Sequence, residues 1–339
     1  MLDVKQAHVA TQFGHDRPMI ACRFDPLGRY VFAGAQDHNL IRFTLGEADG
    51  KKQLFAGAHE SWVMAIAFSK DGGQVISGGG DGRIVWWETA ATGTEAAAPK
   101  PLRTVEAHKG WIRALAVSPD GQFLATGGND LVVRSWKMAD GTLVRELPGH
   151  EKHVYSLEFH PGGQFLLSAD LACYVKQWDL ATGQAARTFD GKTLRYYDAG
   201  FLADYGGIRG MAVSGNSEFL VACGLHKCTN AFAGVNEPHA MLFRWDNQEV
   251  VRSFIADGIP NGLLWRIRFL SDGTAMAVSG GASGGHLLFW KADADKDFHR
   301  LGLPGLARDL DLHPDGLQVA TAHFDHQIRI VKLIAKAPA

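Results

Sequence analysis

The feature that most constrains this chain is a segment that recurs seven times along its length. Each copy consists of an apolar strand, a turn with an acidic residue or glycine, a second strand ending on small residues, and a third strand that often ends in tryptophan. Equivalent first-strand positions are Pro18, Trp62, Trp111, His153, Gly207, Leu263 and Leu306. These positions lie 42 to 56 residues apart, a repeat length typical of β-sheet units and not of helical solenoids.

The turns inside the repeat have residues suited to β-hairpins. The alternating apolar run over residues 63–67 is followed by Asp71-Gly72, and the run over residues 112–117 is followed by Asp120-Gly121. Glycine accepts the positive φ that tight hairpin turns require. The sequence therefore predicts an all-β fold built from antiparallel hairpins.

Length and composition fit one domain over residues 1–339. The chain has 46% hydrophobic residues and 40 glycines, enough for a large core and many hairpins. A chain of this length often forms two domains, but the unbroken repeat favours one. The net charge of -2, from 34 basic and 36 acidic residues, gives no sign of a general nucleic-acid or membrane surface.

Neither the cysteines nor the amino terminus indicates a secreted protein. Four cysteines in a chain this long do not suggest a disulfide framework, so we expect buried free thiols. Residues 1–13 lack a basic start and an apolar stretch, and no run approaches eighteen apolar residues. We therefore expect a cytoplasmic protein without a membrane span. The cysteines are Cys22, Cys173, Cys223 and Cys228.

Three consecutive copies share polar residues at matching offsets. They are His59, Ser77, Asp81 and Trp87; His108, Thr126, Asp130 and Trp136; and His150, Ser168 and Trp178, which Asp179 follows. These copies resemble the WD-repeat (WD40) family of β-propellers, and the resemblance covers nearly the whole chain. It implies a seven-bladed β-propeller of four-stranded antiparallel blades. In that family the histidine precedes the first strand, and the hydroxyl residue, aspartate and tryptophan follow in and around the second and third strands.

The same residue types could also suggest a catalytic triad or a metal site, but their repetition favours a structural network. A nucleophile needs one strained and accessible constellation. Every blade, in contrast, needs partners for its buried indole, hydroxyl and imidazole groups. Blade four has Ala172 where the aspartate is expected, so we predict an incomplete network there. Blades one, five and seven depart from the pattern at Ala33, Ala222 and Val331.

The last copy ends soon after Leu333 without a fourth strand. Residues 4–13 precede the first copy as an additional strand would. The family resemblance implies that residues 4–13 form the outer strand of blade seven and so close the propeller.

Insertions mark where this chain departs from its own repeat. They cover residues 190–206, 224–240, 256–262 and 280–286, around blades four to six, and the resemblance implies that they emerge on one face. The first contains Arg195, Tyr196 and Tyr197, residue types that dominate interface energetics. The alternative is that these aromatic residues hold the loop against blades four and five.

A second candidate group lies at the starts of the first strands, which in WD-repeat proteins surround the mouth of the central channel. It comprises Trp62, Trp111, Arg113, His153, Tyr155, Arg209, Trp265 and Arg308. The two tryptophans could equally be consensus packing. The arginines are costly to bury without partners, and they suit an acidic or phosphorylated peptide.

Two thiols and two imidazoles occur near the second insertion: Cys223, His226, Cys228 and His239. They are ligand types for tetrahedral zinc, but their spacing matches no common zinc motif. We predict no metal and no cofactor, and leave zinc binding by these four residues open.

The leading hypothesis is a non-catalytic scaffold for protein–protein or protein–peptide interaction, acting through the loop face of blades four to six and the channel mouth. One alternative is a propeller enzyme of the hydrolase or lactonase type. However, the aligned mouth positions hold no carboxylate or histidine. They are Ile20, Met64, Arg113, Tyr155, Arg209, Trp265 and Arg308. The other alternative is an RNA-binding subunit, which the near-neutral charge disfavours.

Overall fold

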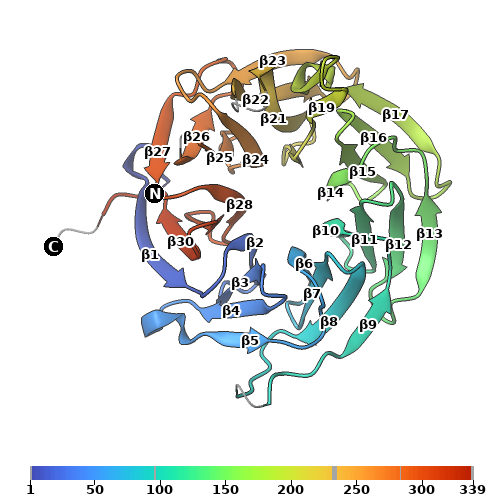
Figure 1. The fold of residues 1–339 in the computed structure, drawn as a ribbon, viewed down its shortest axis with the longest axis vertical. Helices are drawn as coiled ribbons and strands as arrows, with labels where there is room; N and C mark the ends of the chain where they lie inside the picture. Colours follow the sequence, from blue (N-terminus) through green and yellow to red (C-terminus); the bar gives the residue numbers. More distant parts are fainter. Residues whose placement is uncertain (1, 95–96, 231–234, 283, 337–339) are drawn as a thin grey trace. The chain divides into compact units, whose positions relative to one another are not determined.

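The computed structural model describes residues 2–94, 97–230, 235–282 and 284–336. Within these ranges the chain forms thirty β-strands and three short 3₁₀ helices. None of the helices found there is long and apolar enough to cross a membrane. Seven antiparallel sheets have four strands each, and one further sheet has two. The predicted all-β fold of seven four-stranded blades is therefore confirmed (Figure 1).

The chain divides into two compact units, Met1–Pro148 with Asp309–Ala339 and Gly149–Arg308. The expectation of a single domain stays a prediction. The first unit contains three complete sheets. They are β2 (Met19–Phe24), β3 (Tyr30–Ala35), β4 (Leu40–Thr44) and β5 (Gln53–Phe55); β6 (Val63–Phe68), β7 (Gln74–Gly79), β8 (Arg83–Glu88) and β9 (Arg103–Glu106); and β10 (Ile112–Val117), β11 (Phe123–Gly128), β12 (Val133–Lys137) and β13 (Leu143–Leu147).

The second unit also contains three four-stranded sheets. They are β14 (Val154–Phe159), β15 (Phe165–Asp170), β16 (Tyr174–Asp179) and β17 (Ala185–Asp190); β20 (Gly210–Val213), β21 (Phe219–Asn230), β22 (Val235–Arg244) and β23 (Val250–Ile255); and β24 (Gly262–Phe269), β25 (Ala275–Gly281), β26 (Gly284–Trp290) and β27 (His299–Leu303). Between the first two sheets lie a 3₁₀ helix, η3 (Lys192–Leu194), and a two-stranded sheet of β18 (Arg195–Asp198) and β19 (Ala203–Gly206).

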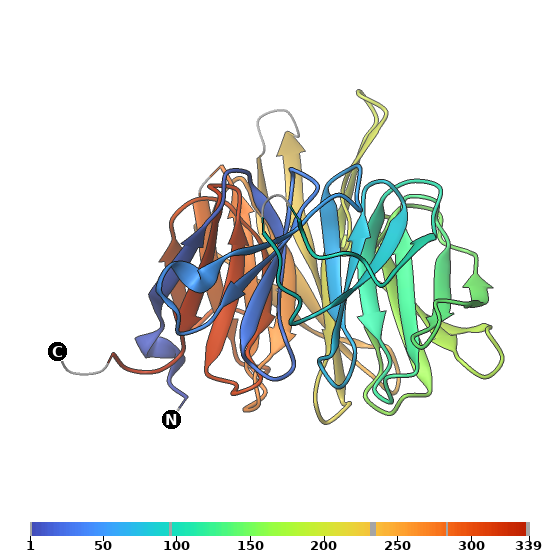
Figure 2. The same cartoon turned by 90° about the horizontal axis from the view of Figure 1, so that it is seen from below.

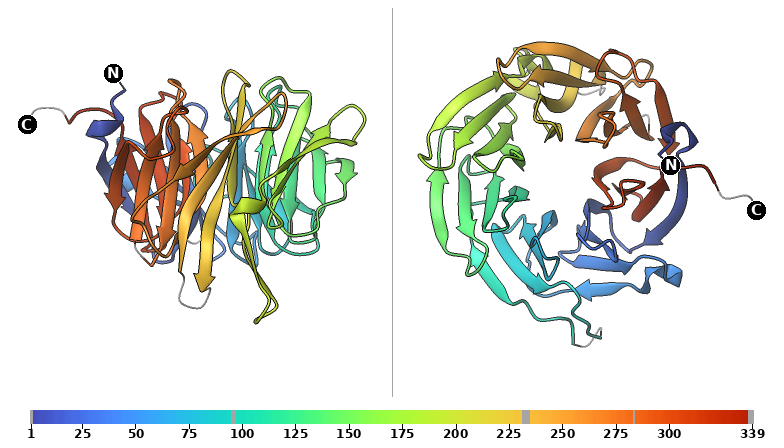
Figure 3. Two further views of the ribbon diagram at one scale, coloured as in Figure 1. Left: turned by 90° about the horizontal axis from the view of Figure 1, so that it is seen from above. Right: turned by 180° about the vertical axis from the view of Figure 1, so that it is seen from behind.

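The amino-terminal strand completes the last blade, as predicted. The strand β1 (His8–Gly14) pairs antiparallel with β30 (Gln327–Lys332) and is the outer strand of the sheet β1-β30-β29-β28. Its other strands are β28 (Ala307–Leu312) and β29 (Gln318–His323). Figure 3 shows β1, in dark blue, along the outer edge of this red sheet. The strand starts later than predicted, because Val4–Gln6 forms the 3₁₀ helix η1. Another 3₁₀ helix, η2 (Ala48–Lys51), follows β4.

Small residues at the ends of second strands let neighbouring backbones approach closely. A Cβ atom added to Gly34 would lie 2.3 Å from the carbonyl oxygen of Val63 on the next blade. In the second unit, a Cβ atom on Gly280 would lie 2.3 Å from the carbonyl oxygen of Ala307. Larger aromatic residues fill the space farther out, where Phe55 contacts Trp87 with ring centroids 5.6 Å apart. The repeated small residues in the sequence therefore reflect close packing between blades.

Candidate functional site

One blade of the first unit contains a buried hydrogen-bond chain from a tryptophan to a carboxylate. Trp87 Nε1 donates to Ser77 Oγ at 3.0 Å, and Ser77 Oγ lies 2.8 Å from His59 Nε2. The chain ends where His59 Nδ1 lies 3.2 Å from Asp81. Burial acts to raise the pKa of Asp81, but the hydrogen bond from His59 and others lower it overall. These groups satisfy one another, so the network stabilises the blade and offers no open nucleophile.

The following blade has the same network with one added cation. Trp136 Nε1 donates to Thr126 Oγ1 at 2.9 Å, and His108 contacts Thr126 at 2.6 Å and Asp130 at 2.8 Å. Arg134 donates to Asp130 at 2.7 Å. Burial opposes ionisation of Asp130, but the bonds from His108 and Arg134 hold its pKa well below the usual value. The network is therefore charged at its outer end.

The first blade of the second unit corrects one prediction. Trp178 Nε1 donates to Ser168 Oγ at 2.7 Å, His150 Nε2 lies 2.6 Å from Ser168, and His150 Nδ1 lies 2.8 Å from Asp170. The expectation that Ala172 leaves this network incomplete is wrong. Asp170 at the end of β15 supplies the carboxylate from two residues earlier, and it is fully buried.

Three of the candidate residues at the starts of the first strands, Arg113, Tyr155 and Trp265, share a structural cause. In five blades the pairing of the first and second strands shifts near the start of the first strand. A β-bulge leaves one residue outside the ladder and redirects its side chain. Four of the five bulge residues are partly exposed, as is expected of groups that face away from the core. The bulge residues are Ile20, Met64, Arg113, Tyr155 and Trp265.

In the second unit two of these bulge residues, Tyr155 and Trp265, alternate with Arg209 and Arg308 in a stack of aromatic rings and guanidinium groups. Arg209 lies over Tyr155, 4.4 Å from the ring centroid, and 5.6 Å from the ring centroid of Trp265. Arg308 lies over Trp265 at 3.8 Å. Cation–π contacts of this kind hold a guanidinium in place while its edge stays able to donate hydrogen bonds. We call Tyr155, Arg209, Trp265 and Arg308 the arginine stack.

The first unit has a smaller group of the same type. The rings of Trp62 and Trp111 lie 5.5 Å apart, and Arg113 lies over Trp111 at 4.3 Å. Arg113 Nε also donates to Asn129 at 3.0 Å. The two tryptophans are partly exposed and pack on each other, which fits the packing role, and a contact role for them stays a prediction.

The first insertion forms a β-hairpin, β18–β19, not an irregular loop. At its base Gly207 N donates to Leu194 O at 2.9 Å, and Leu194 is fully buried. Figure 2 shows the hairpin, in yellow-green, projecting on the same side as the connected ends of β21 and β22. Tyr196 and Tyr205 pack on each other across the two strands at 6.4 Å. Tyr197, in contrast, is 51% exposed.

The tip of the hairpin carries apolar side chains in solvent. Phe201 is 62% exposed and Leu202 is 79% exposed. Tyr196 and Tyr205 thus support the hairpin internally, while Tyr197, Phe201 and Leu202 are exposed. Contact of these exposed side chains with a partner stays a prediction.

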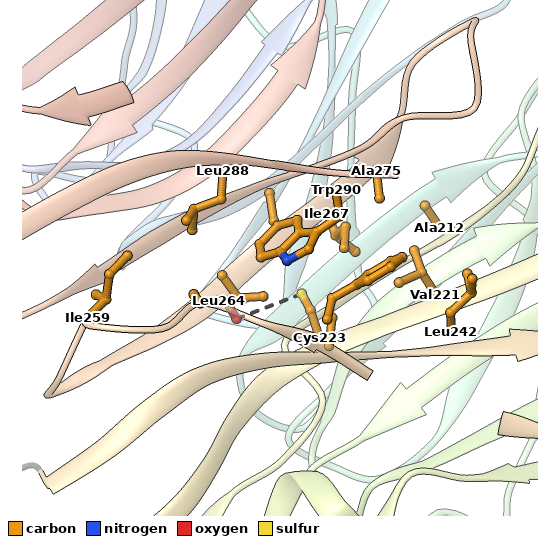
Figure 4. Packing of buried hydrophobic residues seen from close by; sticks show 14 residues of the cluster. Ala212, Val221, Cys223, Leu242, Ile259, Leu264, Ile267, Ala275, Leu288 and Trp290 are labelled. Carbon is orange, nitrogen blue, oxygen red and sulfur yellow. Dashed lines mark hydrogen bonds between the residues drawn. The ribbon is translucent and has the colours of Figure 1, made fainter. Parts of the chain in front are cut away.

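The structure does not assemble the four possible zinc ligands. Cys223 lies in the apolar core, its thiol donating to Leu264 O at 3.8 Å, and burial raises its pKa to about 12 (Figure 4). His226 is an odd number of residues away on the same strand and so lies on the other face, stacked on His239 at 4.6 Å. Within the described ranges, no group of three or more His, Cys, Asp or Glu residues has a metal-binding arrangement. All four cysteines are buried and free.

Comparison with known proteins agrees with the repeats and the networks. The family pattern described as WD domain, G-beta repeat, matches residues 51–88, 99–137 and 141–179. These segments contain every residue of the three complete networks. Three consecutive segments of this seven-bladed β-propeller thus match the WD repeat. It is also similar to WD repeat and FYVE domain-containing protein 1 of Mus musculus, with 28% identity over 88 residues. That match covers 26% of this chain and 21% of the mouse protein.

Sequence reasoning missed two residues beside the arginine stack. Asp204 on β19 accepts hydrogen bonds from Arg195 at 2.6 and 2.8 Å and lies 3.2 Å from Lys152 Nζ. Together with His153, Arg209 and their neighbours, Lys152 and Asp204 line a pocket of about 240 Å³. Both are common surface residues, and nothing in their local sequence indicates that the hairpin brings them together.

Proposed function

We propose that this protein is a non-catalytic scaffold that binds another protein or a peptide. The contact surface is the face that carries the β18–β19 hairpin and the starts of the first strands, which in WD-repeat proteins lie at the mouth of the central channel. The observation that carries the proposal is the combination, within one unit, of an exposed apolar hairpin tip and the arginine stack. Exposed aromatic and arginine groups on an ordered scaffold are typical of interaction surfaces.

The candidate contact residues differ from a catalytic set in their chemistry. The arginine stack contains two guanidinium groups, an indole and a phenol, and none of these is a general base near neutral pH. The histidines, hydroxyls and aspartates of blades two to four bind one another inside the blades. These observations support binding over a hydrolase or lactonase activity. The partner that fits the arginines is acidic or phosphorylated, and a cytoplasmic location remains our prediction.

The proposal is tested by capturing partners from the native source with tagged protein. In one variant, residues 195–206 are replaced by a short Gly-Ser link between the buried Leu194 and Gly207. In a second variant, Arg209 and Arg308 are both changed to glutamate. A control variant, Arg244→Glu, reverses an arginine that lies over Phe219 elsewhere in the same unit.

We expect the first two variants to lose at least nine tenths of the captured partner, while the control retains it. Thermal unfolding of each variant verifies that the blades remain folded. Full retention of the partner by both the shortened hairpin variant and the double arginine variant would show that this face is not the contact surface.

A further inference from the structure

Building on the proposed function, we propose that the pocket at the base of the β18–β19 hairpin binds one glutamate or aspartate side chain of an extended peptide segment, and that an apolar residue of the same segment contacts the hairpin tip. The pocket occupies about 240 Å³ and lies where the hairpin meets the start of β14. We call it the hairpin pocket. Its polar lining comes from Lys152, His153, Asp204, Tyr205 and Arg209.

Arg209 is the fixed cation of the hairpin pocket. Its guanidinium lies between the rings of Tyr155 and Trp265, and its Nη2 donates to Gly206 O at 3.2 Å. Among the described residues, its buried Nε finds no hydrogen-bond acceptor. The guanidinium is thus held in one orientation at the wall of the pocket, with its Nε turned away from solvent. A carboxylate at its edge gains charge-assisted hydrogen bonds with little additional ordering of the arginine.

The charges around the hairpin pocket favour a negatively charged side chain. Lys152 and Arg209 contribute two cations to the lining, and Asp204 contributes one anion. Asp204 remains ionised, because the hydrogen bonds from Arg195 and Lys152 outweigh its burial and lower its pKa. The lining therefore carries one net positive charge, and Arg195, which is bonded to Asp204 from outside the lining, adds another. A carboxylate is attracted to these cations, whereas a phosphate with nearly two negative charges would be placed more strongly against Asp204.

The hairpin supplies a second contact at a defined distance. Its ladder runs from the pair Arg195 and Gly206 at the base to the pair Asp198 and Ala203 near the tip. Three residue steps along a strand span about 10 Å. An extended peptide with its acidic residue in the pocket would therefore place a residue three or four positions away beside Phe201 and Leu202. Asp198 next to the tip disfavours an anionic membrane as the occupant.

The test uses an array of synthetic 12-residue peptides probed with the full-length chain. One position is fixed as glutamate, glutamine or phosphoserine, and the flanking positions are randomised. We expect the glutamate set to bind, with enrichment of a large apolar residue three or four positions from the glutamate. The glutamine and phosphoserine sets are expected to bind at least tenfold more weakly.

Variants of the protein separate the two contacts. Arg209→Gln should remove the preference for glutamate over glutamine while retaining the apolar preference. Lys152→Gln, a change at an exposed side chain, should reduce the glutamate preference without affecting the fold. Phe201→Ser should remove the apolar preference and retain the acidic one. Arg244→Gln, which lies outside the hairpin pocket, should change neither preference.

Three binding preferences would overturn the inference. They are equal binding of glutamate and glutamine peptides, tighter binding of phosphoserine peptides, and an acidic preference that survives both Arg209→Gln and Lys152→Gln. A complete lack of peptide binding would also overturn it. The proposed function would still stand if a native partner is captured through the hairpin face in the absence of such peptide preferences. If no partner depends on that face either, both fail.

Discussion

At the scale of single residues, the repeat separates side chains that hold the blades together from side chains that are available for contacts. The tryptophan, hydroxyl and histidine groups of blades two to four are buried and bonded to one another. The bulge residues at the starts of the first strands are redirected out of the ladder. Variants in the first group should therefore change stability, and variants in the second group should change binding.

Asp170 provides a direct test of the corrected network. It is fully buried and accepts from the backbone of Tyr174 as well as contacting His150. We expect Asp170→Ala to lower the free energy of unfolding by about 2–4 kcal/mol, because a buried imidazole loses its partner. Asp190→Ala, at an exposed position on β17, should change it by less than about 0.5 kcal/mol. Denaturant unfolding of both variants measures the difference, and equal values would contradict the role of Asp170.

His239 should make stability sensitive to acid. Burial, followed by the neighbouring His226 and Lys227, lowers the pKa of His239 to about 4 from its usual 6.5. Above pH 6.5 the imidazole is neutral in the folded and unfolded chains. As the pH falls from 6.5 to about 4, the unfolded chain binds a proton that the folded chain does not, so stability decreases by up to about 3 kcal/mol. The loss should level off below pH 4.

The measurement compares melting temperature against pH for the wild type and His239→Phe. The variant keeps a ring next to His226 but cannot bind the proton, so its curve should fall less between pH 6.5 and 4. Parallel curves for the two proteins would show that His239 does not titrate as described.

At the scale of strands and hairpins, the strand β1 completes the last blade, whereas the β18–β19 hairpin forms a separate two-stranded sheet. On β1, Phe13 is buried and its ring stacks on Phe43 at 5.2 Å. On the β18–β19 hairpin, the apolar tip residues are exposed instead. Removing the first element should therefore affect folding, and removing the second should affect binding.

Phe13→Ala should lower the free energy of unfolding by about 3–5 kcal/mol, because it removes a buried aromatic ring between β1 and the first blade. Deleting residues 1–13 should be more severe and yield protein without cooperative unfolding. Gln12→Ala, an exposed change on the same strand, serves as the control and should cost less than about 0.5 kcal/mol. An unchanged melting temperature after the deletion would argue against the role of β1.

The elements also show what could be predicted from sequence. The blades and β1 were predictable because period-two apolar runs and glycine turns recur at a nearly fixed interval. The extension of β21 and β22 and the β18–β19 hairpin were expected as loops, since neither has a repeated counterpart. Asp170 was missed because the carboxylate moved by two residues relative to the other blades. The partnership of Lys152 with Asp204 depends on tertiary contact alone.

At the scale of the whole molecule, the positive and negative charges nearly cancel. The chain has 34 basic and 36 acidic residues, for a net charge of -2. We therefore expect no measurable binding of a single-stranded 20-nucleotide oligouridylate at 150 mM salt, because nonspecific affinity depends on phosphate neutralisation. Fluorescence anisotropy provides the measurement. Binding that weakens tenfold or more between 50 and 200 mM salt would instead support the RNA-binding alternative.

The central claim is that partners bind the face carrying the β18–β19 hairpin and the first-strand starts. Hydrogen exchange of the protein, alone and with a captured partner, tests it most directly. We predict slower exchange in residues 195–206 and at the starts of β14, β20 and β24 when the partner is bound. Slower exchange confined to the turns at the other ends of these strands, such as residues 160–164 and 214–218, would contradict the claim.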